Sequence, residues 1–236
     1  WLSERRGERE KSFSEGLLPF LMIVGSVSLV LLFQKSTSAA VIIGAVSMIV
    51  YMASGAKWRF AFLLGMLGAT LLTLFVLSTP YRLERIKSFI DRSADSQGAS
   101  YQVTQALTVI GSGRWTGVGY GESTAKNFLP EGMTDSIFAI IAEEFGFIVA
   151  ILIIMLFFTL VTRGLIIARG MKDKFGRLLL TGISSLIGIQ AFIHIASSSA
   201  LIPTTGVPLP FVSYGNFSLA ISMTMVGIML SVDKNG

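Results

Sequence analysis

Six long runs of mainly apolar residues constrain the fold of this chain more than any other feature of its sequence. Each is near the length of about 20 residues that an α-helix needs to cross about 30 Å of hydrocarbon. No alternating strand pattern competes with helix in these runs. The expected spans cover residues 16–33, 39–55, 60–79, 136–162, 178–197 and 211–232. We therefore predict an all-α polytopic membrane protein, with residues 1–236 forming a single membrane domain.

The composition supports lipid as the main solvent of these runs. Hydrophobic residues make up 52% of the 236 residues, charged residues make up 14%, and the mean hydropathy is +0.70. A typical soluble domain has about 25% charged residues and could not bury this much apolar surface in one core. The chain has no cysteine and one histidine, which excludes disulfides, thiolate zinc sites and cysteine nucleophiles.

The lysines and arginines between the apolar runs predict the orientation, because positive charge stays on the cytoplasmic side of a membrane. With both termini inside, the short outer loops hold only Lys35, and six further cations lie in a long outer segment, residues 80–135. The inner segments hold Arg5, Arg6, Arg9, Lys11, Lys57, Arg59, Arg163, Arg169, Lys172, Lys174, Arg177 and Lys234. The net charge of +5 therefore indicates topology, and no nucleic-acid partner is expected.

The long outer segment, residues 80–135, exceeds what a passive connection needs. In YRLERIKSFIDR, Leu83, Ile86 and Ile90 recur at helical spacing beside basic residues, which favours an interfacial helix whose basic face meets lipid headgroups. The stretch YQVTQALTVI repeats this pattern more weakly. The glycine-rich stretch GSGRWTGVGYGES follows; its backbone N–H groups could approach an anion such as phosphate, or it could form only a turn. A nucleotide site is disfavoured because no strand precedes it and no Gly-Lys-Ser follows it.

Three acidic residues mark the fourth span. Asp135 lies at its outer mouth beside Thr134, a suitable helix cap, where its charge also suits the helix dipole. Glu143 and Glu144 lie inside the apolar run, about 12 Å further along the helix axis, where an ionisable group is costly unless it faces a cavity or a partner. They either form a buried hydrogen-bonded lock between helices or take part in chemistry.

The end of the fifth span carries a second group of polar residues. Gln190 and His194 are one helical turn apart, which predicts interhelical hydrogen bonds rather than a proton relay. The following PTTGVPLP has three prolines and cannot be helix. Together with SYGN it predicts a broken or re-entrant element, the kind of irregular backbone that lines binding sites in membrane transporters.

Taken together, these stretches resemble the SEDS family, the polytopic membrane glycosyltransferases of cell shape, division and sporulation that include FtsW, RodA and SpoVE. The residues that carry the resemblance are YQVTQALTVIGSGRWTGVGYGES, FLPEGMTDSIFAIIAEEFGF, DKFGRLL and PTTGVPLPFVSYG, in the family's order and spacing. DKFGRLL and the glycine-rich stretch are most similar to the FtsW branch. Members usually have ten spans, so the six here correspond to the fifth to the tenth. A chain that starts at Trp1 is expected to begin in mid-protein and to be poorly active alone.

The resemblance implies polymerisation of lipid II into glycan strands by an inverting transfer, with Asp135 as the general base and undecaprenyl pyrophosphate as the leaving group. Other implied partners are the nascent glycan, membrane lipid and a class B penicillin-binding protein, in the bacterial cytoplasmic membrane. No metal ligand is assigned, although a divalent cation, Mg or Mn, would suit the leaving-group charge. The candidate substrate-binding residues are Arg114, Ser123, Lys126, Glu131, Thr134, Glu143, Pro208, Ser213 and Tyr214.

Departures from the family pattern leave two rival functions open. The turn QKSTSAA is atypical, His194 stands where an asparagine is common, Asn216 replaces a glycine, and Met133 and Ser136 are unusual neighbours of Asp135. One rival is a transporter of lipid-linked precursors, which would move lipid across the membrane without making polymer. The other is a non-catalytic scaffold for a penicillin-binding protein, in which Asp135 would be dispensable.

Overall fold

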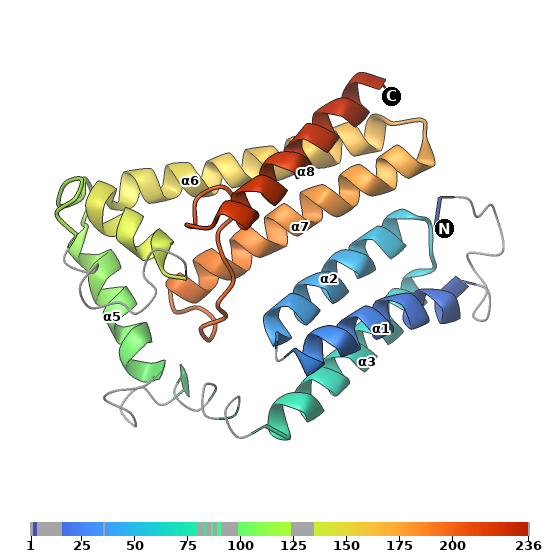
Figure 1. Cartoon of the computed structure of the whole chain (residues 1–236), viewed down its shortest axis with the longest axis horizontal. Coiled ribbons are helices and arrows are strands. Elements are labelled where there is room, and N and C mark those ends of the chain that lie inside the picture. The colour runs from blue at the N-terminus through green and yellow to red at the C-terminus, as the bar shows by residue number, and fades with distance from the viewer. Residues whose placement is uncertain are drawn as a thin grey trace. The chain divides into compact units, whose positions relative to one another are not determined.

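The computed structural model describes residues 2–3, 16–34, 36–79, 83, 86, 89–90, 99–123 and 135–235. Within these ranges every regular element is a helix, so the predicted all-α class is confirmed (Figure 1). Of the basic stretch at residues 82–92, only four residues are described, all helical: Leu83, Ile86, Phe89 and Ile90. The helices are α1 (Leu18–Phe33), α2 (Thr37–Ala53), α3 (Trp58–Leu77), α5 (Ala99–Ser112), α6 (Ile137–Gly170), α7 (Lys174–Ser198) and α8 (Asn216–Asn235).

Four of these helices, α3, α6, α7 and α8, are long and apolar enough to cross a membrane. The helices α1 and α2 are also apolar but have 16 and 17 residues, about 24–26 Å at the helical rise. The chain is therefore a multi-pass membrane protein, while membrane crossing by α1 and α2 stays a prediction.

The first three helices begin and end within two residues of the predicted spans, and the later ones differ more. The fourth span was expected to end at Thr162, but α6 continues to Gly170, and α7 begins at Lys174 rather than Leu178. Helical hydrogen bonding continues past the point where charges end an apolar run. The last helix begins at Asn216 instead of Phe211, since Phe211 has a φ of 65° and lies in a turn.

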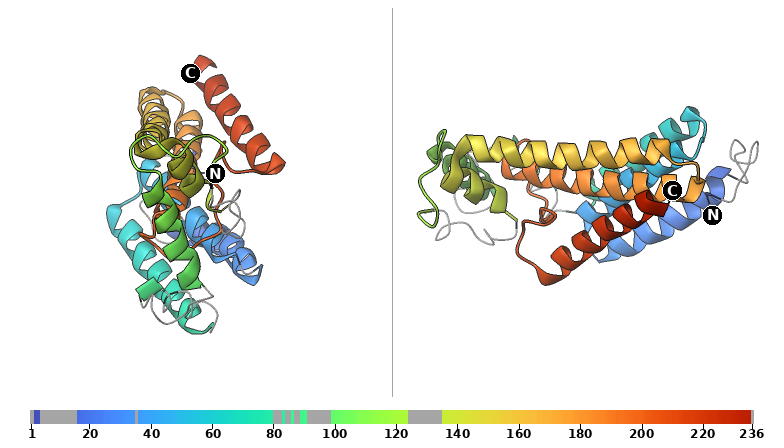
Figure 2. Two further views of the ribbon diagram at one scale, coloured as in Figure 1. Left: turned by 90° about the vertical axis from the view of Figure 1, so that its left-hand side faces the viewer. Right: turned by 90° about the horizontal axis from the view of Figure 1, so that it is seen from above.

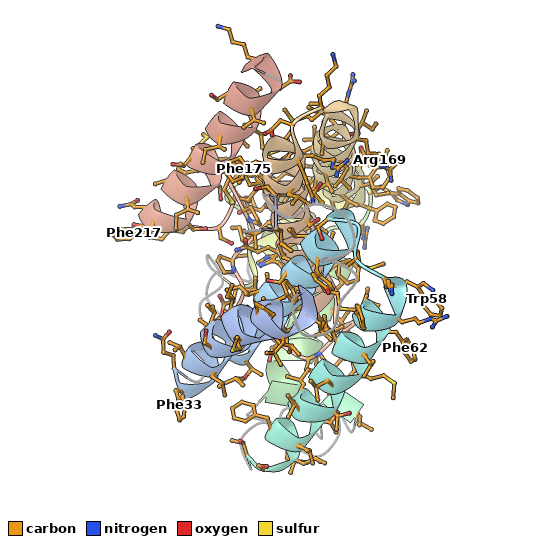
Figure 3. The ribbon with its side chains drawn as sticks, turned by 90° about the vertical axis from the view of Figure 1, so that its right-hand side faces the viewer. Phe33, Trp58, Phe62, Arg169, Phe175 and Phe217 are labelled. Atoms are coloured by element: carbon orange, nitrogen blue, oxygen red, sulfur yellow. The ribbon has the colours of Figure 1, made fainter. Side chains whose placement is uncertain are left out.

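The chain divides into two compact units. The first consists of Trp1–Leu74, Leu160–Ile189 and Met225–Gly236, and the second of Phe75–Thr159 and Gln190–Thr224. In the first unit, α1 and α2 pack through Phe20 and Tyr51, whose rings stack with centroids 4.4 Å apart. Figure 3 shows Trp58 and Phe62 projecting from α3, and both side chains are more than half exposed. Such an exposed apolar helix suits contact with lipid, and tryptophan suits the membrane interface.

The second unit contains α5 and the first part of α6. Ala106 and Val109 of α5 pack against Ala139 and Ile140 of α6, and a neighbouring cluster on α6 is partly covered by Ile195 of α7. In Figures 1 and 2, α6 and α7 run side by side. All of the predicted site residues that the structure describes belong to this second unit.

Candidate functional site

The helix α6 is broken at Gly146, whose φ of 78° and ψ of −178° are not helical (Figure 1). The backbone of the glycine-rich segment supplies the hydrogen-bond partners at this break, and we call the joined residues 113–119 and 143–148 the splice. Two α6 N–H groups donate to the loop, and two loop N–H groups donate to α6. The four bonds are Phe147 N to Arg114 O (2.9 Å), Ile148 N to Trp115 O (3.4 Å), Val118 N to Glu143 O (2.9 Å) and Gly119 N to Glu144 O (3.1 Å).

The splice exchanges two helical bonds for these four. In a continuous helix, residues 147 and 148 would donate to residues 143 and 144. Backbones can approach this closely only without side chains: an added Cβ at Gly117 or Gly146 would lie within 3 Å of backbone atoms across the splice. Because the N–H groups of Val118 and Gly119 already donate to α6 carbonyls, the geometry favours the turn interpretation of the glycines over an anion site.

Glu143 adds a side-chain connection to the splice. Its side chain is 2% exposed and accepts hydrogen bonds from Ser123 Oγ, at short range, and from Ser112 Oγ at 3.3 Å. Ser123 is also buried. A buried carboxylate held by two hydroxyl groups fits the buried lock. Of the predicted substrate-binding residues, the structure therefore brings Ser123 and Glu143 together.

Beyond the backbone bonds that continue the helix to residues 199–202, the last turns of α7 hold the proline-rich segment, residues 199–215, through polar side chains. Prolines lack an N–H group, and this segment forms no helix of its own. Its backbone is bonded to α7 at three successive points, so that it runs back along the helix. These bonds are Gln190 Nε2 to Pro208 O (3.3 Å), His194 Nδ1 to Val207 O (2.7 Å) and Thr205 N to Ser197 Oγ (3.2 Å).

Asp135 lies in the turn that precedes α6 and is half-buried. Ser198 Oγ of α7 donates to its backbone oxygen at 3.4 Å. Its carboxylate faces Gly206 of the proline-rich segment, where an added Cβ would lie 3.5 Å from Asp135 Oδ2. The same end of α7 therefore anchors both the aspartate turn and the segment that its carboxylate faces.

The remaining predicted site residues are spread over the unit or fall outside the described ranges. Arg114 is exposed, with a φ of 48°, and its carbonyl belongs to the splice. Ser213 is buried, accepts the Leu209 N–H at 2.8 Å and donates its own N–H back to Leu209 O at 3.0 Å. Tyr214 is 76% exposed. Lys126, Glu131 and Thr134 lie outside the described residues.

Among the described residues, three that form hydrogen bonds at the site were not among the predicted site residues: Ser112, Ser197 and Ser198. Gly206, which the Asp135 carboxylate faces, was not predicted either. A signal for two of them exists in the sequence, because Ser197 and Ser198 follow Gln190 and His194 at helical spacing and complete one polar face.

In the ranges that the structure describes, no group of three or more His, Cys, Asp or Glu could hold a metal ion.

The family model FTSW_RODA_SPOVE, described as cell cycle protein, matches residues 1–236. The chain is 37% identical over 230 residues to a probable peptidoglycan glycosyltransferase FtsW of Geobacter sp. (strain M18), covering 97% of this chain and 63% of that protein. It is 38% identical over 238 residues to stage V sporulation protein E of Bacillus subtilis (strain 168), covering 99% and 65%. The chain thus spans just under two thirds of the length of these relatives.

Two solved structures share the fold. One is a peptidoglycan synthase complex described as coordinating polymerization and crosslinking, with a TM-score of 0.76, 24% identity, and coverage of 94% of this chain and 62% of that one. The other is a mutant of the rod shape determining protein RodA of Thermus thermophilus, with a TM-score of 0.66, 20% identity, and coverage of 99% and 60%. At these identities the likeness shows the fold alone.

Proposed function

Because the chain belongs to the FtsW, RodA and SpoVE family of cell cycle proteins, we propose that it acts in a peptidoglycan glycosyltransferase that polymerises lipid II into glycan strands. The names of its relatives as peptidoglycan glycosyltransferases support this activity. The observation that carries the proposal at the level of the site is the position of Asp135. It is a half-buried carboxylate in a turn at one end of a membrane helix, beside irregular backbone, and such backbone at membrane depth is typical of substrate sites.

In the proposed reaction Asp135 is the general base. Its carboxylate takes the proton from the 4-hydroxyl of the acceptor sugar while that oxygen attacks the anomeric carbon of the donor. The bond from the anomeric carbon to the pyrophosphate oxygen breaks, and undecaprenyl pyrophosphate leaves with the electron pair. A single displacement inverts the configuration of the donor carbon, so one base is sufficient and no covalent sugar–enzyme intermediate forms.

The negative charge of the leaving group needs cations near the outer end of the helices. Arg114 is exposed in the splice, and Lys126 and the basic stretch at residues 82–92 belong to the same outer segment of the sequence. We propose these residues for the pyrophosphate, with a divalent cation as a further source of positive charge. The exposed apolar faces of the helices would accommodate the lipid tails.

The proposed location is the bacterial cytoplasmic membrane, with both ends of the chain in the cytoplasm and Asp135 on the outer side. A class B penicillin-binding protein is the proposed partner. The support is the fold shared with a complex described as coordinating polymerization and crosslinking. Such a partner would crosslink the strands that this protein makes.

The test is polymerisation of labelled lipid II by the full-length protein with its cognate partner, comparing the parent with Asp135→Asn. This change is nearly isosteric, keeps the backbone bond from Ser198, and removes the base. We expect the rate to fall by about 10²–10⁴-fold. Asp233→Asn, an exposed carboxylate on α8, serves as the matched control and is expected to polymerise like the parent.

The other outcomes identify the rival functions. Equal product from the parent and from Asp135→Asn would place the base elsewhere. If neither makes polymer while lipid II still crosses liposome membranes, transport replaces polymerisation. If the partner makes polymer at the same rate with and without this protein, the protein is a scaffold.

A further inference from the structure

The polar face of α7 between Gln190 and Ser198 contains a histidine that the mechanism above does not use. We propose that His194 is a positioning residue for the general base: its imidazole fixes the Val207 carbonyl and thereby holds the neighbouring Gly206 opposite the Asp135 carboxylate. The inference rests on the proposed function, since it assigns His194 a role in the reaction attributed to Asp135.

The hydrogen bond of His194 is the shortest of those between α7 and the proline-rich segment that are described above. Nδ1 lies 2.7 Å from Val207 O, and the ring is 1% exposed. A carbonyl oxygen only accepts, so Nδ1 carries the hydrogen. Buried in this way, the bond is shielded from competing water, and its loss would leave a carbonyl oxygen unsatisfied.

Simple packing does not account for an imidazole at this position. Within the described residues, the buried Nε2 atom has no hydrogen-bond partner, and such an atom lowers stability. A leucine would fill similar space without that cost. The histidine therefore contributes something an apolar residue cannot, and the contact available to it is the bond from Nδ1 to Val207.

The chain of contacts from His194 to Asp135 is short. Val207 is adjacent to Gly206, and Gly206 is the residue whose added Cβ would lie 3.5 Å from Asp135 Oδ2. Ser198, one turn beyond His194, holds the Asp135 backbone oxygen. The aspartate turn and the facing Gly206 are thus both tied to α7 within five residues, which fixes their geometry relative to each other.

A general base acts only within about 2.6–3.2 Å of the proton-bearing oxygen, and a displacement of about 1 Å can cost about 10²-fold in rate. Release of the proline-rich segment would uncover the carboxylate and change its position. The expected effect is on the chemical step. Turnover should fall more than the KM for lipid II rises.

The first experiment measures the position of the segment without using activity. Val207 is buried, so a Val207→Cys substitution in a cysteine-free full-length protein reports release of the segment by its rate of maleimide labelling. We expect His194→Leu to raise this rate at least tenfold, and His194→Asn, which keeps an N–H donor, to keep it near the parent value. Ser184→Ala is the matched control, because Ser184 is a buried α7 residue whose hydroxyl has no hydrogen-bond partner among the described residues.

The second experiment measures lipid II polymerisation by the same His194 and Ser184 variants with valine at position 207. We expect a loss in kcat of about 10–100-fold for His194→Leu, recovery to within a few-fold in His194→Asn, and parent-like turnover in Ser184→Ala. Unchanged labelling in His194→Leu would overturn the positioning contact, and faster labelling with unchanged kcat would overturn the role in the reaction. A parent that makes no polymer would refute the proposed function, while the labelling rates would still decide the contact.

Discussion

Two pieces of irregular backbone lie in the same unit of this protein, and they are held in opposite ways. The splice joins two stretches of backbone through four N–H to carbonyl bonds. Backbone bonds continue α7 to residues 199–202, and beyond them the proline-rich segment is held by side chains of α7, chiefly Gln190, His194 and Ser197. In both regions the backbone is not helical, so its N–H and C=O groups need hydrogen-bond partners that a continuous helix would have supplied.

The difference shows which residues each region needs. Backbone bonds across the splice require the absence of side chains, so the important residues are glycines. The proline-rich segment cannot supply enough N–H groups of its own, so it requires donors and acceptors on a neighbouring helix. A substitution that adds one carbon should therefore damage the splice most, and a substitution that removes one polar atom should damage the proline-rich segment most.

The largest expected effect is that of Gly146→Ala or Gly117→Ala. Each added Cβ would lie within 3 Å of backbone atoms across the splice, and both glycines have positive φ angles. Backbone cannot move aside as a flexible side chain can, so we expect the free energy of unfolding to fall by about 3 kcal/mol or more. Thermal unfolding of the purified protein in detergent, followed by size-exclusion chromatography, measures the loss.

Gly111→Ala is the control for that prediction. Gly111 lies in α5, close in sequence to the splice, and an added Cβ there has nothing within 4 Å. We expect alanine in this helix to change the unfolding free energy by about 1 kcal/mol or less, in the stabilising direction. Equal losses at positions 111 and 146 would show that the close approach across the splice does not matter.

An intermediate effect is expected when the side-chain part of the splice is removed. Glu143→Leu would leave the buried Ser123 hydroxyl group without its carboxylate, while the Ser112 hydroxyl would keep its bond to Val109 O. We expect a loss of about 2–3 kcal/mol in the free energy of unfolding. Glu143→Gln keeps one acceptor oxygen and should lose about half as much. Denaturant titration of both variants gives the comparison, and a leucine variant as stable as the parent would rule out the lock.

The smallest effect is expected for Ser213→Ala in the proline-rich segment. The variant loses the hydroxyl that accepts the buried Leu209 N–H, although the Leu209 carbonyl keeps its bond from the backbone of residue 213. We expect a loss of about 1 kcal/mol. Ser26→Ala is the control, because that hydroxyl donates only to the α1 backbone in an exposed position, and its change should stay within about 0.5 kcal/mol. A loss as large as that of Gly146→Ala would contradict the contrast between the two regions.

Much of the fold was predictable from hydropathy. The all-α class and the first three helices follow from apolar runs of nearly span length, because lipid leaves helix as the simplest way to satisfy the backbone. The limits of the later helices were less predictable: α6 continues through Arg163, where an apolar run ends but helical bonding does not, and α8 begins only after the turn at Phe211.

The site was predictable in its residue types and less so in its pairings. The sequence indicated Asp135 as a carboxylate at the end of a span, Glu143 as an ionisable group in an apolar run, and Gln190 and His194 as one polar face. It did not show that Glu143 pairs with Ser123, or that Gly206 faces the Asp135 carboxylate. These contacts join residues 20 and 71 positions apart, and sequence spacing carries no information about them.

The sequence alone therefore determined the helical membrane fold, the place of the polar residues along each helix, and the two segments that cannot be regular, since these depend on local hydropathy, helical period and proline chemistry. Only the tertiary structure decided the use of those segments. The glycines serve close backbone contact at the break in α6, and α7 ties the proline-rich segment to the aspartate turn. Both outcomes depend on which backbone groups remain unpaired after the helices pack, and that depends on contacts between distant parts of the chain.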